Sequence, residues 1–242
     1  MKLRIASWNI RKAVGLDWRR DPARVLRVLG DIAPDIALLQ EADRRLAPRH
    51  PALPLGQVRA AGWDWIDADP ATPSIGHHGN AILVRPGTRI SRMVPLDLPG
   101  LEPRGGILTR LELADASLTL GALHLGLRRA DRRRQIGRAI ATAEALGAPI
   151  LLGGDLNEWR RRLRALPLPE GWTEVVPGPS FHAARPTLAL DRFLLGPGLI
   201  THGAGVWPRL DAAHASDHLP VWIEIGRDPA AVHNSRPKAA KR

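Results

Sequence analysis

An acid and an imidazole stand side by side just before a short apolar run near the C-terminus. Asp217 and His218 precede the stretch VWIEI, residues 221–225, which is typical of a buried strand. Pro220 cannot donate a hydrogen bond to a neighbouring strand and favours extended backbone at the residue before it, so we expect the pair on the loop that leads into this strand. A loop can direct both side chains into one cleft. The simpler alternative is a turn aspartate beside an unrelated histidine.

Similar polar residues occupy the ends of other predicted strands, where apolar packing does not require them. These residues are Asn9, Glu41, His124, Asp155 with Asn157 two positions beyond it, and Asp191. Each of them alone is more simply a cap or a turn residue. If they converge with Asp217 and His218, they provide three or four hard oxygen ligands, two imidazoles and no thiolate. That set suits Mg²⁺ or Mn²⁺ and disfavours a closed Zn²⁺ site.

Two segments place a carboxylate at the end of a strand in the same way. In each, a helical pattern is followed by an Ala-Pro break and a strand that is apolar on both faces: APDIALLQE ends at Glu41, and GAPILLGGD ends at Asp155. The first helix is predicted to begin at Asp21 as cap and Pro22 as first residue. A strand buried on both faces implies layers on either side of its sheet, and open α/β sheets bind ligands at the ends of their strands.

The remaining pattern predicts many strands and about three helices. Further strands are expected at residues 3–9, 81–85, 107–113, 118–124, 190–195 and 221–225, and the pair 107–113 and 118–124 is predicted to form a hairpin. We therefore expect an α/β fold: a four-layer α/β/β/α sandwich of two packed mixed sheets with outer helices. It is expected to form one domain over residues 1–226, followed by a disordered basic tail at residues 227–242.

Pro-rich and Gly-rich stretches predict surface loops at residues 44–62, 69–79 and 166–185. His77 and His78 fall in the second of these. Adjacent histidines are a poor arrangement for binding one zinc ion, so we interpret both as loop residues.

Composition limits the class of protein. A hydrophobic fraction of 44% in 242 residues can fill a sizeable core, and no apolar run approaches the ~18 residues of a membrane span. The chain has no Cys, which excludes disulfides, thiolate metal sites and Cys nucleophiles. With no export signal at the N-terminus either, a cytoplasmic location is expected.

The charge is strongly basic, with a formal net charge of +11. Two arginine clusters, residues 127–138 and 160–164, are each predicted to start a helix. They follow His124 and Asn157 by three residues, so we expect them to line the rim of a cleft that receives a polyanion. Solvated helix faces are the alternative. Trp159 could stack on a base or a lipid head group, although packing in the core is favoured.

Six motifs in order resemble the endonuclease/exonuclease/phosphatase superfamily, the fold of deoxyribonuclease I and exonuclease III. They are SWNIR, LLQEAD, GALHLG, GGDLNEW, LDRFLLG and SDHLP, and together they span residues 7 to 220. The resemblance implies an enzyme that hydrolyses phosphoric esters with the help of Mg²⁺ or Mn²⁺.

The resemblance also implies roles for the strand-end residues. Glu41, with Asn9 and Asp217, would hold the metal ion, while Asp155 and Asn157 would orient or activate the attacking water. His218, paired with Asp191, would act as general base or contact the phosphate. His124 would act as general acid or bind phosphate. Arg104 and Asn80 are candidate phosphate contacts, with loop or turn roles as equal alternatives.

Two departures from the family pattern bear on these roles. The chain contains no Tyr, whereas the abasic-site endonuclease branch uses a Tyr near the position of His124, so abasic-site repair is not expected. In deoxyribonuclease I a Glu from an earlier strand steadies the acid His, but the comparable stretch here, GHHGNAILV, offers no acid.

The sequence thus predicts a Mg²⁺-dependent phosphodiesterase, with a nuclease acting on DNA or RNA as the first hypothesis. A phospholipid or phosphoinositide phosphodiesterase of the sphingomyelinase type is the alternative. A non-catalytic nucleic-acid-binding protein is a third reading. No protein partner is implied.

Overall fold

The computed structural model describes residues 1–43, 50–68, 74–114, 116–159 and 168–229, whose strands form two six-stranded sheets. The first sheet consists, in spatial order, of β11 (Leu199–Val206), β12 (Val221–Arg227), β1 (Lys2–Asn9), β2 (Ile36–Gln40), β4 (Ala81–Val84) and β3 (Asp64–Trp65). The second consists of β5 (Arg89–Leu98), β6 (Arg104–Glu112), β7 (Ser117–His124), β8 (Ile150–Asp155), β10 (Asp191–Leu195) and β9 (Thr173–Val175). Each sheet contains one parallel pair, β1 with β2 and β7 with β8, among antiparallel neighbours.

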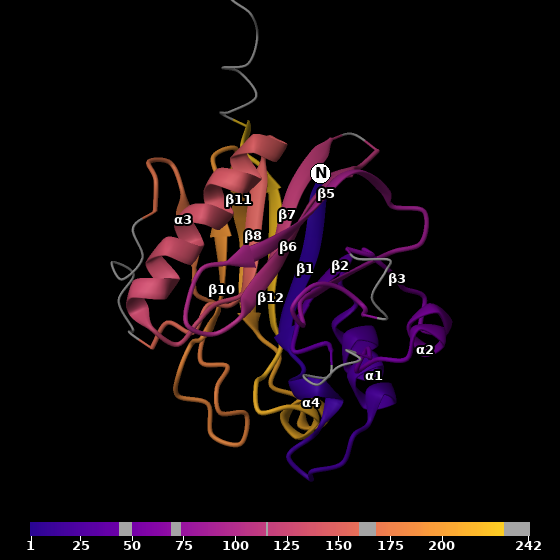
Figure 1. The fold of residues 1–242 in the computed structure, drawn as a ribbon. Helices are drawn as coiled ribbons and strands as arrows, with labels where there is room; N and C mark the ends of the chain where they lie inside the picture. The colour runs from indigo at the N-terminus through magenta and orange to yellow at the C-terminus, as the bar shows by residue number, and fades with distance from the viewer. Residues whose placement is uncertain (44–49, 69–73, 115, 160–167, 230–242) are drawn as a thin grey trace, which may run out of the picture.

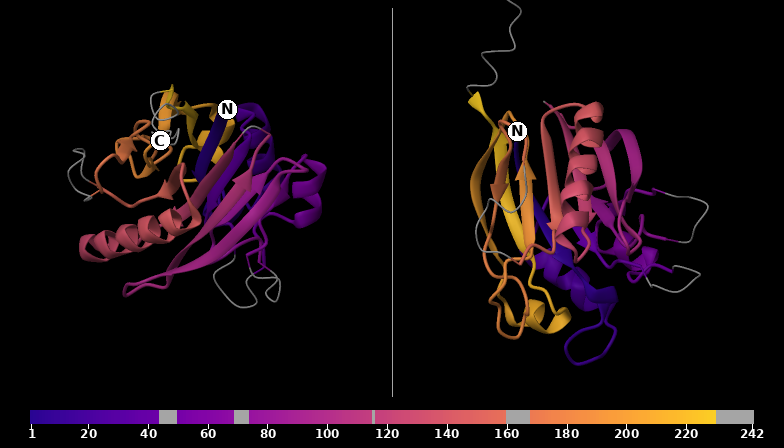
Figure 2. Two further views of the ribbon diagram at one scale, coloured as in Figure 1. Left: turned by 90° about the horizontal axis from the view of Figure 1, so that it is seen from above. Right: turned by 60° about the vertical axis from the view of Figure 1, so that its left-hand side comes forward.

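Helices cover the outer faces of the two packed sheets, which confirms the predicted four-layer α/β/β/α sandwich. On the first sheet lie α1 (Pro22–Ile32), α2 (Leu55–Ala60) and α4 (Leu210–Ala215), and on the second lies α3 (Arg129–Leu146). Figure 1 shows α3 on one side of the sheets and α1 and α2 on the other, and the views in Figure 2 keep α3 outside the strands.

Among the described residues, the buried apolar side chains form three clusters, because side chains on the strands point alternately to the two faces of each sheet. On β1, Ile5 faces the second sheet while its neighbour Ala6 faces the helices of the first sheet; on β2, Leu38 and Leu39 divide in the same way. Successive side chains of a strand point to opposite faces, so a strand buried on both faces contributes to two cores. All residues of β2 and β8 are buried, as the two apolar segments predicted.

The predicted helix signals are present. Asp21 caps α1, and its Oδ1 accepts a hydrogen bond from the Arg24 backbone N–H at 2.9 Å, while Pro22 is the first helical residue. The hairpin of β6 and β7 also forms, as predicted.

Several expectations about the surface were wrong. The predicted loop at 44–62 contains α2, the one at 166–185 contains β9, and β3, β5, β11 and α4 were not predicted. These elements are short or lie at sheet edges, where apolar periodicity is weak. The strand β12 extends to Arg227, one residue into the predicted tail. The rest of that tail from residue 230, and the cluster at 160–164, lie outside the described residues. Among the described helices, none has the length and apolar character needed to cross a membrane.

Candidate active site

Strand register brings three of the predicted site residues to one edge of the second sheet. Asp155, the last residue of β8, pairs with His124 at the end of β7 and with Asp191 at the start of β10. On the first sheet, Asn9 ends β1 beside Gln40, and Glu41 follows directly. The apolar strands therefore deliver polar residues to a common edge, which is where sheets of this kind bind ligands.

The carboxylate of Asp155 is the meeting point of the two sheets. Its Oδ2 accepts a hydrogen bond from Asn9 Nδ2 at 3.1 Å. The same oxygen lies 3.4 Å from His124 Nε2 and 3.7 Å from His218 Nε2. All four side chains are buried. Residues separated by more than two hundred positions thus surround one carboxylate oxygen.

His218 is held by a buried acid. Its Nδ1 lies 2.8 Å from Asp191 Oδ2, which also accepts a hydrogen bond from Ser180 Oγ at 2.5 Å. Burial disfavours charge on this imidazole, but the attraction of Asp191, Asp155 and Asp217 outweighs it and raises the pKa of His218 to about 10. His218 therefore carries a proton at neutral pH and presents Nε2 toward Asp155.

His124 has the opposite protonation. Burial is the main cause that lowers its pKa to about 4, against the attraction of Asp155. Arg104 Nη1 lies 2.8 Å from His124 Nε2, and because a guanidinium only donates, this ring nitrogen accepts and the imidazole is neutral. Arg104 is also held by Glu102, whose Oε2 lies 2.8 Å from its Nη2. The sequence offered no acid to steady His124; Arg104 makes this contact instead.

Two site residues adopt left-handed backbone conformations that residues other than glycine rarely adopt. Glu41 and Asn157 have φ of 51° each. Asn157 is fixed by its backbone N–H, which donates to Asp155 Oδ1 at 3.0 Å, and by its Nδ2, which donates to the Leu125 carbonyl at 2.9 Å. Such outliers gather at functional sites, since surrounding structure must hold them in place.

The proposed metal ligands are already next to cations of the protein. Glu41 Oε2 forms an ion pair with Lys12 Nζ, and Asp217 Oδ2 lies 3.7 Å from Arg11 Nε. Asn9 Oδ1 accepts a hydrogen bond from the Arg11 backbone N–H at 3.1 Å. These three residues offer oxygen atoms only, which is the donor set that a hard divalent cation prefers. The residues present fit such an ion.

Comparison with known proteins identifies the family. A sequence model of the endonuclease/exonuclease/phosphatase family matches residues 6–218, most of the chain. The chain belongs to the endonuclease/exonuclease/phosphatase family. The proteins of this family are generally hydrolases of phosphoester bonds. A curated relative, the uncharacterized protein YbhP of Escherichia coli strain K12, is 30% identical over 161 residues, which is 62% of this chain and 63% of YbhP. The match thus spans less than two thirds of that relative.

Solved structures share the fold of this chain. A family protein from Bacteroides thetaiotaomicron superimposes with a TM-score of 0.75 at 19% identity, over 94% of this chain and 98% of that chain. Truncated Caenorhabditis elegans TDP2 gives 0.71 at 18% identity, over 93% and 98%. TDP2 of D. rerio, complexed with a single-stranded DNA product, gives 0.67 at 17% identity, over 93% and 99%.

The hydrogen bonds of the Asn80 side chain go to residues other than those around Asp155. It is fully buried, and its Nδ2 donates to the carbonyls of Gly105 at 2.8 Å and His77 at 3.3 Å. These contacts favour the turn role over contact with a phosphate. Arg104, by contrast, reaches the site through His124.

The first arginine cluster is divided by the helix that it begins. Arg128, Arg129 and Arg133 are exposed at the start of α3, but Arg132 is buried and its Nη2 lies 3.2 Å from Glu158 Oε2. The expectation that the whole cluster lines a rim is therefore wrong for Arg132, which braces α3 against the chain after β8. In an α-helix every third or fourth residue lies on the same side, and Arg132 lies on the side of α3 that packs against the protein.

Trp159 corrects another expectation. Its side chain is 50% exposed rather than part of a core, and its ring lies 6.3 Å from that of Phe181. The Phe181 ring in turn lies 4.9 Å from that of His218. An exposed aromatic surface thus adjoins the buried imidazole.

Sequence reasoning gave no role to Arg11, Lys12 or Ser180. Arg11 ends the first motif, SWNIR, and Lys12 follows it directly, so their position was a usable signal. Nothing local marks Ser180, which reaches Asp191 only through tertiary structure.

Proposed function

We propose that this family member is a Mg²⁺-dependent or Mn²⁺-dependent phosphodiesterase that cleaves nucleic acid. The observation that carries the proposal is the convergence of Asn9, His124 and His218 on Asp155 Oδ2 at 3.1–3.7 Å, beside oxygen donors suited to a hard cation. Glu41, Asn9 and Asp217 would hold the metal ion. When bound, it would polarise a phosphoryl oxygen and stabilise the developing negative charge.

The side chains of the protein supply the other contributions. Protonated His218 lends positive charge where the transition state gathers negative charge, and Asp191 keeps it charged and oriented. Asp155 and Asn157 position the attacking water, with Asp155 as the acceptor of its proton. Neutral His124 and cationic Arg104 act as a pair that receives a phosphate oxygen from the side of β6 and β7.

Aromatic and basic side chains near the site favour nucleic acid as substrate. Trp18 is 78% exposed, and the Arg11 guanidinium carbon lies over its ring, 4.6 Å from the ring centre. Trp159 is exposed beside Phe181. Exposed aromatic rings stack on unpaired bases, and Arg attracts the phosphate backbone. A likeness in fold to D. rerio TDP2, solved with a single-stranded DNA product, is consistent with this substrate class.

The test is hydrolysis of a nitrophenyl phosphodiester, followed by a panel of single-stranded DNA, duplex DNA, RNA and phospholipid vesicles. We expect activity that chelator abolishes and Mg²⁺ restores, with nucleic acid cleaved in preference to lipid. The KM for nucleic acid should rise with salt, because counterion release drives its binding. Activity that survives the chelator contradicts the metal requirement. Cleavage of phospholipid alone contradicts the substrate class, and binding of DNA without any turnover contradicts catalysis.

A further inference from the structure

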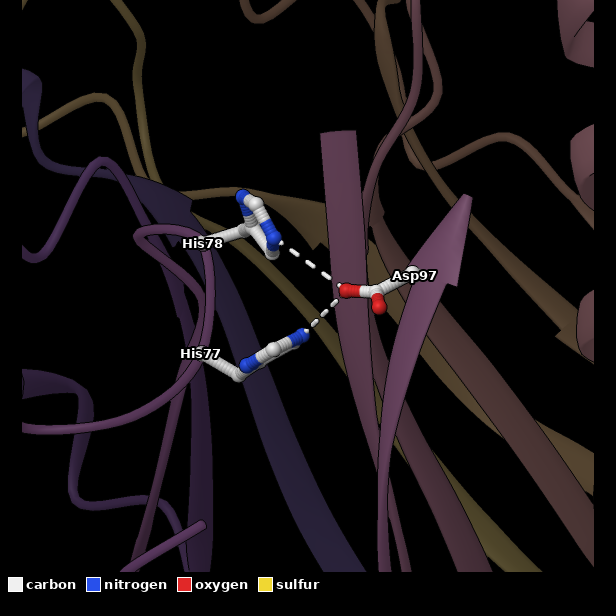
Figure 3. A group of neighbouring side chains, drawn as sticks. All are labelled: His77, His78 and Asp97. Carbon is white, nitrogen blue, oxygen red and sulfur yellow. Dashed lines mark hydrogen bonds and ion pairs between the residues drawn. The ribbon is translucent and has the colours of Figure 1, made fainter. Parts of the chain in front are cut away.

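His77, His78 and Asp97 gather in one place outside the group around Asp155. His77 Nε2 lies 2.9 Å and His78 Nε2 3.2 Å from the same oxygen, Asp97 Oδ1. Figure 3 shows both rings directed at this carboxylate from the turn that faces β5. We propose that these three residues form a binding site for a transition-metal ion such as Zn²⁺, separate from the oxygen ligands near Glu41.

A tight turn directs the side chains of the two adjacent histidines to the same side. The backbone N–H of His77 donates to the Asn80 carbonyl at 2.9 Å, and that of Asn80 donates back to His77 at 2.8 Å. The two central residues, His78 and Gly79, have φ of 47° and 79°, as in a type I′ turn. The turn rotates His78 until its ring meets that of His77 at a centre distance of 4.5 Å. Both histidines lie in a turn, as predicted, and this turn directs both rings at one carboxylate although the residues are adjacent.

Glycine on the neighbouring strand allows the turn to approach Asp97. Gly105 pairs with Asp97 between β6 and β5. A Cβ placed on Gly105 would lie 2.8 Å from His78 Cβ, closer than carbon atoms approach. The absence of a side chain at this position lets the histidines reach across β6 to the acid on β5.

The spacing of the donor atoms suits one ion. Zinc ligands stand about 2.0–2.2 Å from the metal, so two donors in a tetrahedron lie about 3.3 Å apart. The observed separations of 2.9 and 3.2 Å are close to this value, and all three donor atoms lie within 4.8 Å of one another. Two imidazoles and one carboxylate suit Zn²⁺ or Co²⁺ far better than Mg²⁺.

The site is open on one side. The His77 and His78 side chains are each 20% exposed, and that of Asp97 is 80% exposed. Three protein ligands with a solvent side leave a fourth position for water. An ion can therefore enter without any change in the core.

The turn that carries the histidines also supports Glu41. The Gly79 carbonyl accepts a hydrogen bond at 2.8 Å from the backbone N–H of Ala42, which follows Glu41. Gly105, which contacts the turn, is the residue directly after Arg104 on β6. A metal ion at the site would therefore stiffen backbone on two sides of the proposed active site.

The experiment titrates metal-free protein with Co²⁺ in the presence of excess Mg²⁺. Mg²⁺ fills the oxygen site, whereas Co²⁺ bound by imidazoles in a low-coordinate site gives intense visible absorption. We expect saturable binding with such bands in the wild type and in Glu41→Gln. His77→Ala and His78→Ala should weaken binding about 100-fold or more, since loss of even an outer-shell partner costs 10–100-fold. His202→Ala, which removes an exposed histidine on β11, is the matched control and should bind as the wild type does.

Asp97→Asn guards against effects on folding, because the exposed side chain keeps its shape and loses only its charge. It should weaken Co²⁺ binding while circular dichroism stays unchanged. Zn²⁺ should raise the Tm of the wild type and of His202→Ala but not that of His78→Ala. Three outcomes would each overturn the proposal. The wild type could show no saturable binding, His77→Ala and His78→Ala could give bands identical to those of the wild type, or Glu41→Gln alone could lose the bands. None of these readouts depends on phosphodiesterase activity.

Discussion

Asp155 and His124 are paired in register across β7 and β8, and their side chains approach to 3.4 Å between Oδ2 and Nε2. The pairing of two buried parallel strands, rather than a loop, therefore fixes the centre of the candidate site. Sites on regular elements hold their geometry more closely than sites on loops, because packing and backbone hydrogen bonds fix both partners. Asp191 extends the same row from β10.

Replacement of Asp155 is expected to remove turnover without loss of the fold. Asp155→Ala deletes the carboxylate that accepts a hydrogen bond from Asn9 and lies beside His124 and His218, and one positioned acid–base group typically contributes about 10²- to 10⁴-fold. Steady-state kcat on a nitrophenyl phosphodiester measures the loss, and circular dichroism checks the fold. Asp211→Ala, at an exposed position on α4, is the control and should keep full activity. A near wild-type kcat for Asp155→Ala would refute its role.

His218 and Asp191 should behave as one unit. Their 2.8 Å contact is buried, so removal of either partner disables the same imidazolium. We expect His218→Ala and Asp191→Asn each to lower kcat, and the double variant to be little worse than His218→Ala alone. Kinetics of the two single variants and the double variant measure this coupling. Losses that multiply in the double variant would show that the two residues act independently.

The two active-site imidazoles should differ in charge in the metal-free protein. Asp191 and its acidic neighbours outweigh burial and raise the pKa of His218 to about 10, while burial lowers that of His124 to about 4. Side-chain NMR in the presence of chelator should therefore find His218 protonated and His124 neutral at pH 7. Asp191→Asn should lower the pKa of His218.

The same pKa differences predict the pH dependence of stability. Since the folded pKa of His218 lies above its usual 6.5, its contribution to the free energy of unfolding is present below pH 6.5 and declines as pH rises toward 10. For His124 the folded state disfavours the proton, so stability declines as pH falls from about 6.5 to 4. Two imidazoles that titrate together near pH 6.5 would contradict both assignments.

The layers of the fold could be predicted because the buried strands carry their own signal. β2 and β8 are apolar on both faces, which requires covering layers, and each ends in a carboxylate that packing does not explain. The edge strands β5 and β11 gave no such signal. Most of β5 is exposed or half-buried and contains Pro95, which only an edge strand accommodates easily.

The contacts within the site were less predictable, because they join residues through tertiary structure. The approach of Arg104 to His124 depends on the register of β6 with β7, and the ion pair of Lys12 with Glu41 depends on left-handed backbone at both residues. A sequence shows the residue types in these pairs but not the backbone angles that bring them together. The same limit applied to His77 and His78, whose shared direction follows from a turn with two positive φ values.

Lys12 should compete with the metal ion for Glu41. Its ammonium forms an ion pair with Glu41 Oε2, one of the proposed metal ligands, so metal binding has to displace it. Ion pairs near a surface are worth up to about 1 kcal/mol, which corresponds to about a fivefold change in affinity. We therefore expect Lys12→Met to lower the Mg²⁺ concentration for half-maximal activity by up to about fivefold.

The matched control is Lys2→Met, which removes a lysine paired with Glu224 Oε2 at 3.4 Å on the strands β1 and β12, away from Glu41. Its Mg²⁺ dependence should equal that of the wild type. Titration of activity with Mg²⁺, supported by calorimetry, separates metal affinity from kcat at saturating Mg²⁺. A higher Mg²⁺ requirement in Lys12→Met would mean that Lys12 supports the metal site rather than competing with the ion, and an unchanged requirement would mean that metal binding leaves the ion pair intact.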